Sequence, residues 1–433
     1  MKALRIVYLV LFVFIAPGFT QNLTADNLES FDLVSQTVNK SHFDTTYGGI
    51  DWMAMRDRYR PQIVSAKGIE EFNLITNQML FELRLSHLLV ASEDMLKAYM
   101  PTLFSEGTVG MDVRWMQNKA VITKIKPGFP GQAAGMKPGY VITQIDGQSV
   151  NEIIQHAEVL PPYNVRNRKG GISNYLAGHI NGPPNTSVSI TYLDENAHVR
   201  EALINRQTRG TGKVVVNDAI PPIFIEFETQ RLEGNIGYIW FNHFAAPVDK
   251  TFLNALETMR DTRGLIFDLR GNPGGYFRIM DTIVEQLITV KTPLYRFRLR
   301  DNTVERTLNP PGNPYKKPVV VLIDVTSMST SELFAACLQA IGRAVIVGER
   351  SPGYLLGAKW IKLPNGLSFM HSFLQPIPYG GYIVEGNGVK PDIEIELNSK
   401  GLLEGRDNQM EAAIAHILKR ACNEEQTIYA IKP

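Results

Sequence analysis

The spacing of hydrophobic residues changes twice along the chain, and each change marks a different kind of structure. From residue 21 to about residue 100 the apolar positions recur at helical intervals, which predicts a helical N-terminal domain over 21–100. The clearest apolar stripe comprises Phe72, Ile75, Met79 and Leu83. A second helix is expected over 51–59, ending before Pro61 because the residue that precedes a proline disfavours helical conformation.

Short apolar runs separated by Gly and Pro turns begin near residue 101. This pattern of short strands and turns is typical of a small β-rich domain, which we expect over 101–208. Its expected strands are 113–115, 120–125, 140–145 and 187–192. The Gly-Thr-Gly sequence at 210–212 supplies a flexible link to the next domain.

Strand-like and helix-like runs then alternate over 209–420. This alternation predicts an α/β domain with a mainly parallel sheet covered by helices, in a chain that is α+β as a whole. The expected strands are 236–241, 264–269, 319–323 and 344–348, and the expected helices are 250–260, 279–288 and 331–341. Residues 421–433 are expected to form a C-terminal tail.

The N-terminus has the pattern of an export signal. Lys2 and Arg5 precede an apolar run over 6–15, and a Pro-Gly pair ends it. This run is close in length to a signal-peptide core and short for a membrane span. We therefore expect a signal peptide over 1–20, a periplasmic or secreted protein, and no stable membrane span after cleavage. An uncleaved membrane anchor is the alternative.

Composition excludes several classes of function. A formal net charge of +1 argues against a nucleic-acid-binding protein, which would carry a basic excess. Two cysteines, Cys337 and Cys422, are too few for a scaffold held by disulfides. The sequence has no metal-ligand spacing, no P-loop and no dinucleotide fingerprint, so we expect no metal and no cofactor.

The first motif with chemical potential is Asp-Leu-Arg-Gly-Asn-Pro-Gly-Gly over 268–275, directly after a buried strand. Ligand sites of open α/β sheets lie at such strand ends. Gly274 and Gly275 can adopt positive φ and present backbone N–H groups to a developing oxyanion. A plain Pro-Gly-Gly turn is the alternative.

The second motif, Asp-Val-Thr-Ser-Met-Ser-Thr-Ser-Glu-Leu over 324–333, also follows a buried strand and opens a helix. A serine on such a turn has its hydroxyl near the helix N-terminus, where the helix dipole favours negative charge. Ser329 is therefore a candidate nucleophile. Ser329 and Glu332 also have the spacing of a capping box, so a purely structural N-cap is the alternative.

These two motifs, together with 342–349 and Gly-Val-Lys-Pro-Asp over 388–392, resemble the S41 peptidases. That family includes C-terminal-processing (tail-specific) proteases and the tricorn core protease. In addition, residues 131–147 resemble the most recognisable stretch of a PDZ domain. The resemblance implies a ClpP/crotonase-like catalytic domain, a PDZ domain over 101–208 and serine-peptidase activity.

The chain departs from one branch of the family. Many C-terminal-processing proteases use a lysine 25 residues after the nucleophile as the base, and this chain has Tyr354 at that position. A phenol with a pKa of about 10 is a poor base near neutral pH. Lys359 lies five residues further on and stays an alternative.

The tricorn-like branch of the family offers another base. There a histidine preceded by serine lies upstream of the PDZ domain, and a glutamate lies just before the Gly-Val-x-Pro-Asp motif. The resemblance therefore implies His87 as general base, Ser86 as its hydrogen-bond partner and Glu385 as the end of the relay. Gly275 and Thr330 would supply the oxyanion hole. Other candidate bases are His243, the second choice, and His371.

A PDZ domain binds peptides by adding an extended strand to a sheet edge. By position, Gly110 and Met111 would bind the substrate in the loop before the first strand. The alternative is that this module only supports the catalytic domain, and the long excursion over 161–182 departs from a compact PDZ domain.

The expected function is a serine endopeptidase or C-terminal processing peptidase that hydrolyses its substrates through an acyl-enzyme. The expected partners are unfolded proteins or peptides with free C-termini, without nucleic acid. Related enzymes often assemble, which leaves a homo-oligomer open. The alternative function is a catalytically inactive S41-like protein that binds peptides or apolar ligands, an alternative motivated by Tyr354.

Overall fold

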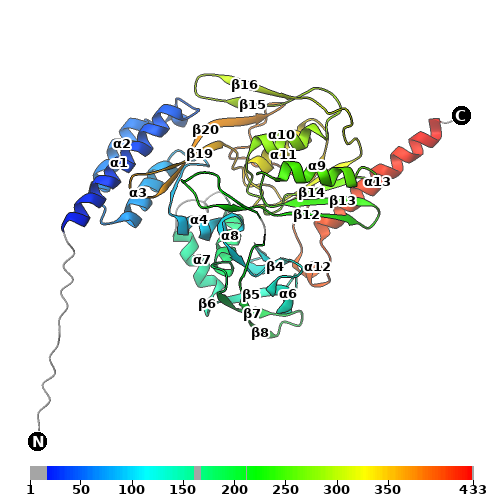
Figure 1. Cartoon of the computed structure of the whole chain (residues 1–433), viewed down its shortest axis with the longest axis horizontal. Coiled ribbons are helices and arrows are strands. Elements are labelled where there is room, and N and C mark those ends of the chain that lie inside the picture. The colour runs from blue at the N-terminus through cyan, green and yellow to red at the C-terminus, as the bar shows by residue number, and fades with distance from the viewer. Residues whose placement is uncertain (1–16, 160–166, 211, 432–433) are drawn as a thin grey trace, which may run out of the picture.

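The computed structural model describes residues 17–159, 167–210 and 212–431 of the 433-residue chain. Most of the predicted signal peptide, residues 1–16, lies outside the described residues. Figure 1 shows three parts: a group of N-terminal helices, a β-rich module, and an α/β unit against which both pack. None of the helices in the described ranges is both long enough and apolar enough to cross a membrane.

The α/β unit is built on a six-stranded sheet. Its strands, in spatial order, are β12 (Phe227–Leu232), β13 (Ile236–Phe241), β14 (Leu265–Asp268), β17 (Val319–Ile323), β18 (Val345–Gly348) and β21 (Ile393–Glu394). Every neighbouring pair is parallel except β12 with β13. The predicted parallel sheet is confirmed, as are the four strands expected over 236–348.

Helices cover both faces of this sheet because its strands are apolar on both sides. Within β17, Val319, Val321 and Ile323 face one core, while Val320 and Leu322 face the other. The first core is covered by α9 (Val248–Thr258), α10 (Phe277–Glu285) and α11 (Thr330–Ala340). The second is covered by α13 (Asn408–Ile431), which continues through residue 421. The boundary expected there for a separate tail therefore lies inside a helix.

A second, antiparallel sheet was not predicted from the sequence. Its order is β1 (Leu89–Ala91), β20 (Ser368–Pro378), β15 (Thr292–Arg298) and β16 (Thr303–Leu308), with β19 (Gly357–Lys362) also paired to β20. Strand β1 comes from the N-terminal part of the chain and pairs with β20 from Leu89–Met370 to Ala91–Ser368. This pairing joins the segment that precedes β1 to the α/β unit.

The N-terminal helices are α1 (Pro17–Ser41), α2 (Trp52–Ser65) and α3 (Ile69–Phe81), with a short 3-10 turn, η1 (Tyr47–Gly49). Their apolar stripes share a core with Leu363, Leu367 and Phe369 of the β19–β20 region. The prediction that the second helix ends before Pro61 is wrong, because α2 continues to Ser65. Pro61 is exposed, so water can satisfy the carbonyl that loses its helical partner there.

The β-rich module contains the sheet β3 (Met111–Met116), β4 (Lys119–Ile125), β5 (Val141–Ile145), β7 (Ser187–Leu193) and β8 (Val199–Asn205), which confirms the four expected strands. Its helices are α6 (Pro130–Ala133), α7 (Val150–Val159) and α8 (Arg168–Ile180). The remaining elements are α4 (Glu93–Tyr99), α5 (Pro101–Phe104), β2 (Gly107–Thr108), β6 (Gln148–Ser149), β9 (Gln207–Thr208), β10 (Lys213–Val214), β11 (Ile223–Phe224) and α12 (Ser399–Leu403).

The buried side chain of Asn77 holds β1 in place from its outer edge. Its amide nitrogen donates to the Val90 carbonyl, and its amide oxygen accepts from the Val90 N–H, both at 2.8 Å. Because Val90 lies on the edge strand, these two bonds replace the ladder bonds that another strand would supply. Asn77 therefore connects α3 to the segment that follows residue 87.

We expect Asn77→Ala to lower the free energy of unfolding by about 1–3 kcal/mol, since it leaves the N–H of Val90 without a partner. The Val90 carbonyl keeps the amide of Asn73 as a donor, at 2.9 Å. Chemical denaturation followed by circular dichroism measures this loss. Gln78→Ala, at an exposed position of the same helix, is the matched control and should change stability by less than about 0.5 kcal/mol. Equal effects of the two variants would contradict the role assigned to Asn77.

Candidate active site

Ser329 lies where the central strand β17 turns into α11. It is the N-cap residue of this helix, with φ 55° and ψ −118°, a backbone conformation that non-glycine residues rarely adopt. Strain of this kind persists only where surrounding contacts impose it, and it is concentrated at functional sites. The candidate nucleophile therefore has both the predicted position and a backbone geometry that a plain helix cap does not require.

The buried carboxylate of Glu332 imposes part of this geometry. It accepts hydrogen bonds from the N–H groups of Ser329, Gly353 and Tyr354 and from the hydroxyl of Ser351, at 2.6–3.0 Å. Burial raises the pKa of Glu332 to about 8, against these hydrogen bonds. The capping interaction predicted between Ser329 and Glu332 is thus present, and it extends to the loop that carries Tyr354.

A second buried carboxylate, Asp324, shapes the turn before Ser329. One of its oxygens accepts from the backbone N–H and the hydroxyl of Thr326 at 2.8 and 2.6 Å. The other lies 3.0 Å from Nε of Arg114, which comes from β3 of the β-rich module. Burial opposes the charge of Asp324, but Arg114 and Thr326 outweigh it and hold its pKa below the usual range. The module therefore contacts the nucleophile turn directly.

The Gly-Gly pair lies against the candidate nucleophile. A Cβ on Gly274 would be 2.7 Å from Cβ of Ser329 and 2.8 Å from the nitrogen of Thr330, so only glycine fits. Gly275 has φ 138° and would place a Cβ 2.4 Å from the Phe244 carbonyl oxygen. Among the described residues, neither the Gly275 N–H nor the Thr330 N–H has a hydrogen-bond acceptor. These free donors fit the oxyanion hole predicted for them.

Ser86, His87 and Glu385 form a continuous hydrogen-bonded chain. The hydroxyl of Ser86 donates to Oε2 of Glu385 at 2.8 Å and lies 2.7 Å from Nδ1 of His87. A hydroxyl has one proton, so Ser86 must accept from an Nδ1–H of His87. The other ring nitrogen, Nε2, is then unprotonated and able to act as a base.

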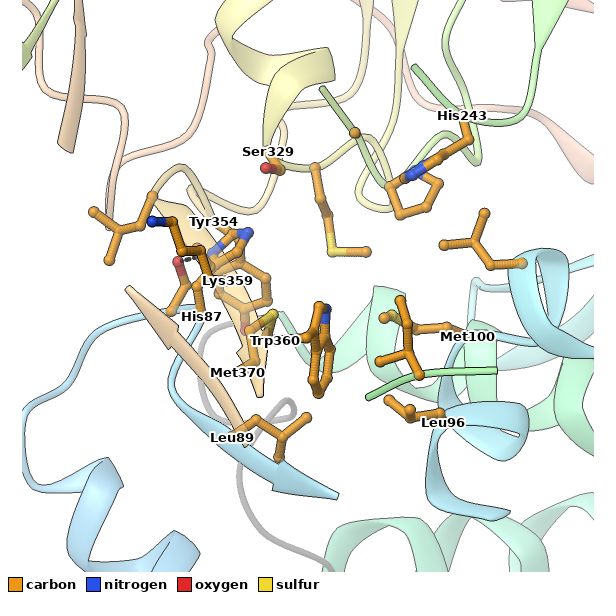
Figure 2. Close-up of a pocket in the computed structure, with 18 of the residues that line it drawn as sticks. His87, Leu89, Leu96, Met100, His243, Ser329, Tyr354, Lys359, Trp360 and Met370 are labelled. Atoms are coloured by element: carbon orange, nitrogen blue, oxygen red, sulfur yellow. Dashed lines mark hydrogen bonds between the residues drawn. The ribbon is translucent and has the colours of Figure 1, made fainter. Parts of the chain in front are cut away.

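His87 and Ser329 line the same cavity, although no hydrogen bond joins them directly. Figure 2 shows both side chains at this cavity, with Tyr354 beside His87. Catalytic hydrogen bonds are often long before substrate binds. Part of the His87 ring reaches the cavity, but its surroundings still lower its pKa to about 4 through burial. The imidazole is therefore neutral at physiological pH.

The other candidate bases are placed less favourably. Lys359 lines the cavity from an exposed position, with its ammonium 4.6 Å above the ring of Phe373. His243 also lines the cavity, and burial lowers its pKa to about 4. His371 lies outside the cavity lining, with its Nδ1 3.3 Å from the Ser41 hydroxyl. His87 alone among these histidines carries the hydrogen-bonded carboxylate relay.

Gly110 and Met111 are not brought to this site. The Gly110 N–H bonds the Thr108 hydroxyl at 3.1 Å, and Phe129 covers the place where a Cβ of Gly110 would lie. The edge of β3 that a peptide would extend is covered by α8, because the buried Ser173 hydroxyl accepts the Trp115 N–H at 2.9 Å. The backbone donor of Trp115, which strand addition at this edge would use, is therefore already occupied.

The cavity beside Ser329 has a volume of about 620 Å³ and is lined mostly by apolar side chains. Helices α4 and α8 form part of its wall. Sequence reasoning missed this wall, although the excursion over 161–182 was a signal that the module carried an extra element. In the described part of the chain, no group of three or more His, Cys, Asp or Glu side chains is arranged to hold a metal ion.

We expect Glu332→Gln to reduce kcat strongly while the fold survives. A glutamine amide has only one acceptor oxygen, so its NH₂ group must face backbone donors that now have no acceptor. The predicted cost is about 1–3 kcal/mol of unfolding free energy, with a larger fractional loss of turnover because the Ser329 turn relaxes. Steady-state kinetics and denaturation measure the two effects. Glu70→Gln, the same change at an exposed position of α3, is the control; unchanged kcat in Glu332→Gln would contradict the proposal.

Comparisons with known proteins agree with this geometry. Residues 235–395 match the model of peptidase family S41, and residues 24–81 match the model of the tricorn protease C1 domain. The putative tricorn protease homolog 2 of Streptomyces coelicolor is 23% identical over 411 residues, which is 89% of this chain and 32% of the relative. The carboxy-terminal processing protease CtpB of Bacillus subtilis is 23% identical over 293 residues, which is 66% of this chain and 55% of the relative.

Among solved structures, mature CPAF complexed with lactacystin has a TM-score of 0.61 and 13% sequence identity, and the match covers 93% of this chain and 99% of that one. At such identity the likeness concerns the fold. The chain spans about a third and about half of the length of the two relatives named above. These matches and the motifs together identify the region over 235–395 as a peptidase family S41 domain.

Proposed function

We propose that this protein is a serine peptidase that hydrolyses peptide bonds through an acyl-enzyme at Ser329. The observation that carries the proposal is the relay from Glu385 through Ser86 to His87, which leaves a basic imidazole nitrogen at the cavity that Ser329 lines. A serine hydroxyl needs such a base to become a useful nucleophile. The similarity to named proteases supports the same reaction.

The chemistry follows from the positions of these groups. His87 Nε2 takes the proton of the Ser329 hydroxyl while Oγ forms a bond to the scissile carbonyl carbon. The carbon–nitrogen bond then breaks, and the imidazolium gives its proton to the leaving amine. Water, deprotonated by the same imidazole, hydrolyses the ester and restores Ser329. Each of the two oxyanion donors, Gly275 and Thr330, contributes about 3 kcal/mol to transition-state stabilisation.

The organisation of the chain supports a role outside the cytoplasm on unfolded protein substrates. We take 1–20 as a signal peptide, 21–100 as the helical domain, 101–208 as a PDZ-like module and 209–420 as the catalytic domain. The similarity to carboxy-terminal processing proteases favours unstructured polypeptides as substrates. The inactive alternative rests on Tyr354, but His87 removes the need for a lysine at that position.

We expect Ser329→Ala to lower the cleavage of an unfolded protein substrate by at least about 10³-fold and to abolish labelling by a fluorophosphonate probe. Gel-based cleavage and probe fluorescence measure both. Ser65→Ala, at an exposed serine at the end of α2, is the matched control and should behave as the wild type. Labelling that persists in Ser329→Ala would remove the nucleophile assignment, and a folded wild type that is never labelled would favour the binding-protein alternative.

We expect the acid limb of kcat/KM against pH to lie well below pH 6.5 and toward pH 4. Burial lowers the pKa of His87 to about 4, so the base stays unprotonated until that pH is approached. The pKa values of His42, His243 and His371 are lowered in the same way, each to about 4. The unfolded chain therefore takes up protons near pH 6.5 before the folded chain does, and stability falls as pH drops from 6.5 to 4.

Circular dichroism at each pH separates loss of fold from loss of the base. The Glu332→Gln variant separates any limb near pH 8, where Glu332 itself titrates, from the limb of His87. An acid limb at or above pH 6.5 in a protein that is still folded would contradict the assignment of His87.

A further inference from the structure

The cavity beside Ser329 is divided into a reactive end and an apolar end. In Figure 2, Ser329 and His243 lie at one end, and Leu89, Leu96 and Met100 lie at the other, with Trp360 between them. We call the second group, together with Met95, Tyr99, Trp360 and Met370, the apolar pocket; all seven residues line the cavity. Methionine side chains are flexible and adapt to apolar groups of different shape.

The residues that line the cavity offer little charge to pair with an ionic side chain of a substrate. No Asp, Glu or Arg side chain of the described residues lines it. Lys359 is the one lining residue with a permanent charge in this part of the chain, and it sits at an exposed position above Phe373. His87 and His243 are neutral because burial lowers both pKa values to about 4. A substrate Lys or Arg side chain would therefore meet no carboxylate among these lining residues, and a substrate Asp or Glu could pair only with the exposed Lys359. Burying an unpaired charge is costly.

Two backbone donors at the place where a free C-terminus would be captured are already occupied. The Gly110 N–H is used within its own loop, and the Trp115 N–H at the edge of β3 is bonded to Ser173 of α8. The same helix turns its N-terminal residues toward the cavity, where Gly170, Gly171 and Asn174 form part of the lining. Helix α8 thus covers the peptide-binding edge of the module and walls the catalytic cavity instead.

We propose that the site selects its substrate by one or two large apolar side chains beside the scissile bond, which enter the apolar pocket, and not by a free C-terminal carboxylate. The proposal rests on the peptidase function argued above and specifies its substrate class. A volume of about 620 Å³ holds more than one side chain, since pockets of roughly 300–1,000 Å³ enclose whole drug-sized ligands. The occupant is therefore a short apolar stretch of polypeptide rather than a single small residue.

The test uses internally quenched peptides of one length with the full chain. Members of the set carry Phe, Leu or Met, or else Gly, Lys or Asp, on either side of the scissile bond. Each peptide is made as a free acid and as a C-terminal amide. We expect kcat/KM to be roughly 10- to 100-fold higher for the apolar members, from the transfer of one large side chain out of water. Acid and amide forms should agree within about twofold.

A charged substitution in the apolar pocket should change which substrate side chains the protein prefers. Met100→Glu should lower cleavage of the apolar peptides and raise cleavage of the Lys peptides above the wild-type rate, because the new carboxylate pairs with the substrate ammonium. Met100→Gln, which adds polarity without charge, should lower the first rate and leave the second low. Met53→Glu, at a 47% exposed position on α2, is the control and should match the wild type.

The outcomes separate this inference from the proposed function. If Ser329-dependent cleavage is absent for every peptide, the peptidase function fails. If cleavage depends on Ser329 but is equal for apolar and charged members, or if the acid exceeds the amide by more than about tenfold, the peptidase function stands and this inference is overturned. Should Met100→Glu not fold, Met100→Gln against the peptide set still tests the pocket, and an unchanged preference would count against it.

Discussion

The hydrogen bond from the Ser86 hydroxyl to Glu385 connects residues 299 positions apart, and the rest of the site depends on it. It joins the end of the N-terminal helical part to the loop after β20. The backbone N–H of Ser86 donates to the same carboxylate at 2.8 Å, so the connection fixes main chain as well as side chain. His87 follows at φ 57°, a conformation that aims its ring while Ser86 holds Nδ1. Without this anchor, β1 could pair with β20 and still leave the imidazole without a fixed tautomer.

Two buried carboxylates support the strained turn at Ser329 from opposite sides. Glu332 ties the turn to the loop before β19, and Asp324 ties it to Arg114 of the β-rich module. Each carboxylate is expensive to bury and is compensated by several donors. Such a network has one satisfied arrangement, so a shift of the module is transmitted to the nucleophile turn through a short path of hydrogen bonds and one ion pair rather than through the core.

The sequence predicted the α/β unit well because its strands are apolar on both faces and its helices are strongly periodic. The nucleophile turn and the Gly-Gly loop were also predictable, since both are local. The second sheet was not, because β1 has only three residues and its partner lies far along the chain. The relay of Ser86 and Glu385 came from family resemblance alone. No local pattern could indicate that Ser173 closes the edge of β3, because that contact depends on how α8 packs.

Tyr354 supports the architecture of the site although its side chain is not a useful base. Its backbone retains two structural roles, because its N–H donates to Glu332 at 2.8 Å and its carbonyl accepts from the Ser329 N–H at 2.9 Å. Only the side chain differs from the lysine of related enzymes, and here it lines the cavity as an aromatic wall. A lysine there would place a charge beside His87 and depress its basicity further. The aromatic side chain and the histidine base are therefore compatible. Tyr354 adds apolar surface to the cavity at the position where the lysine-dependent enzymes have their base.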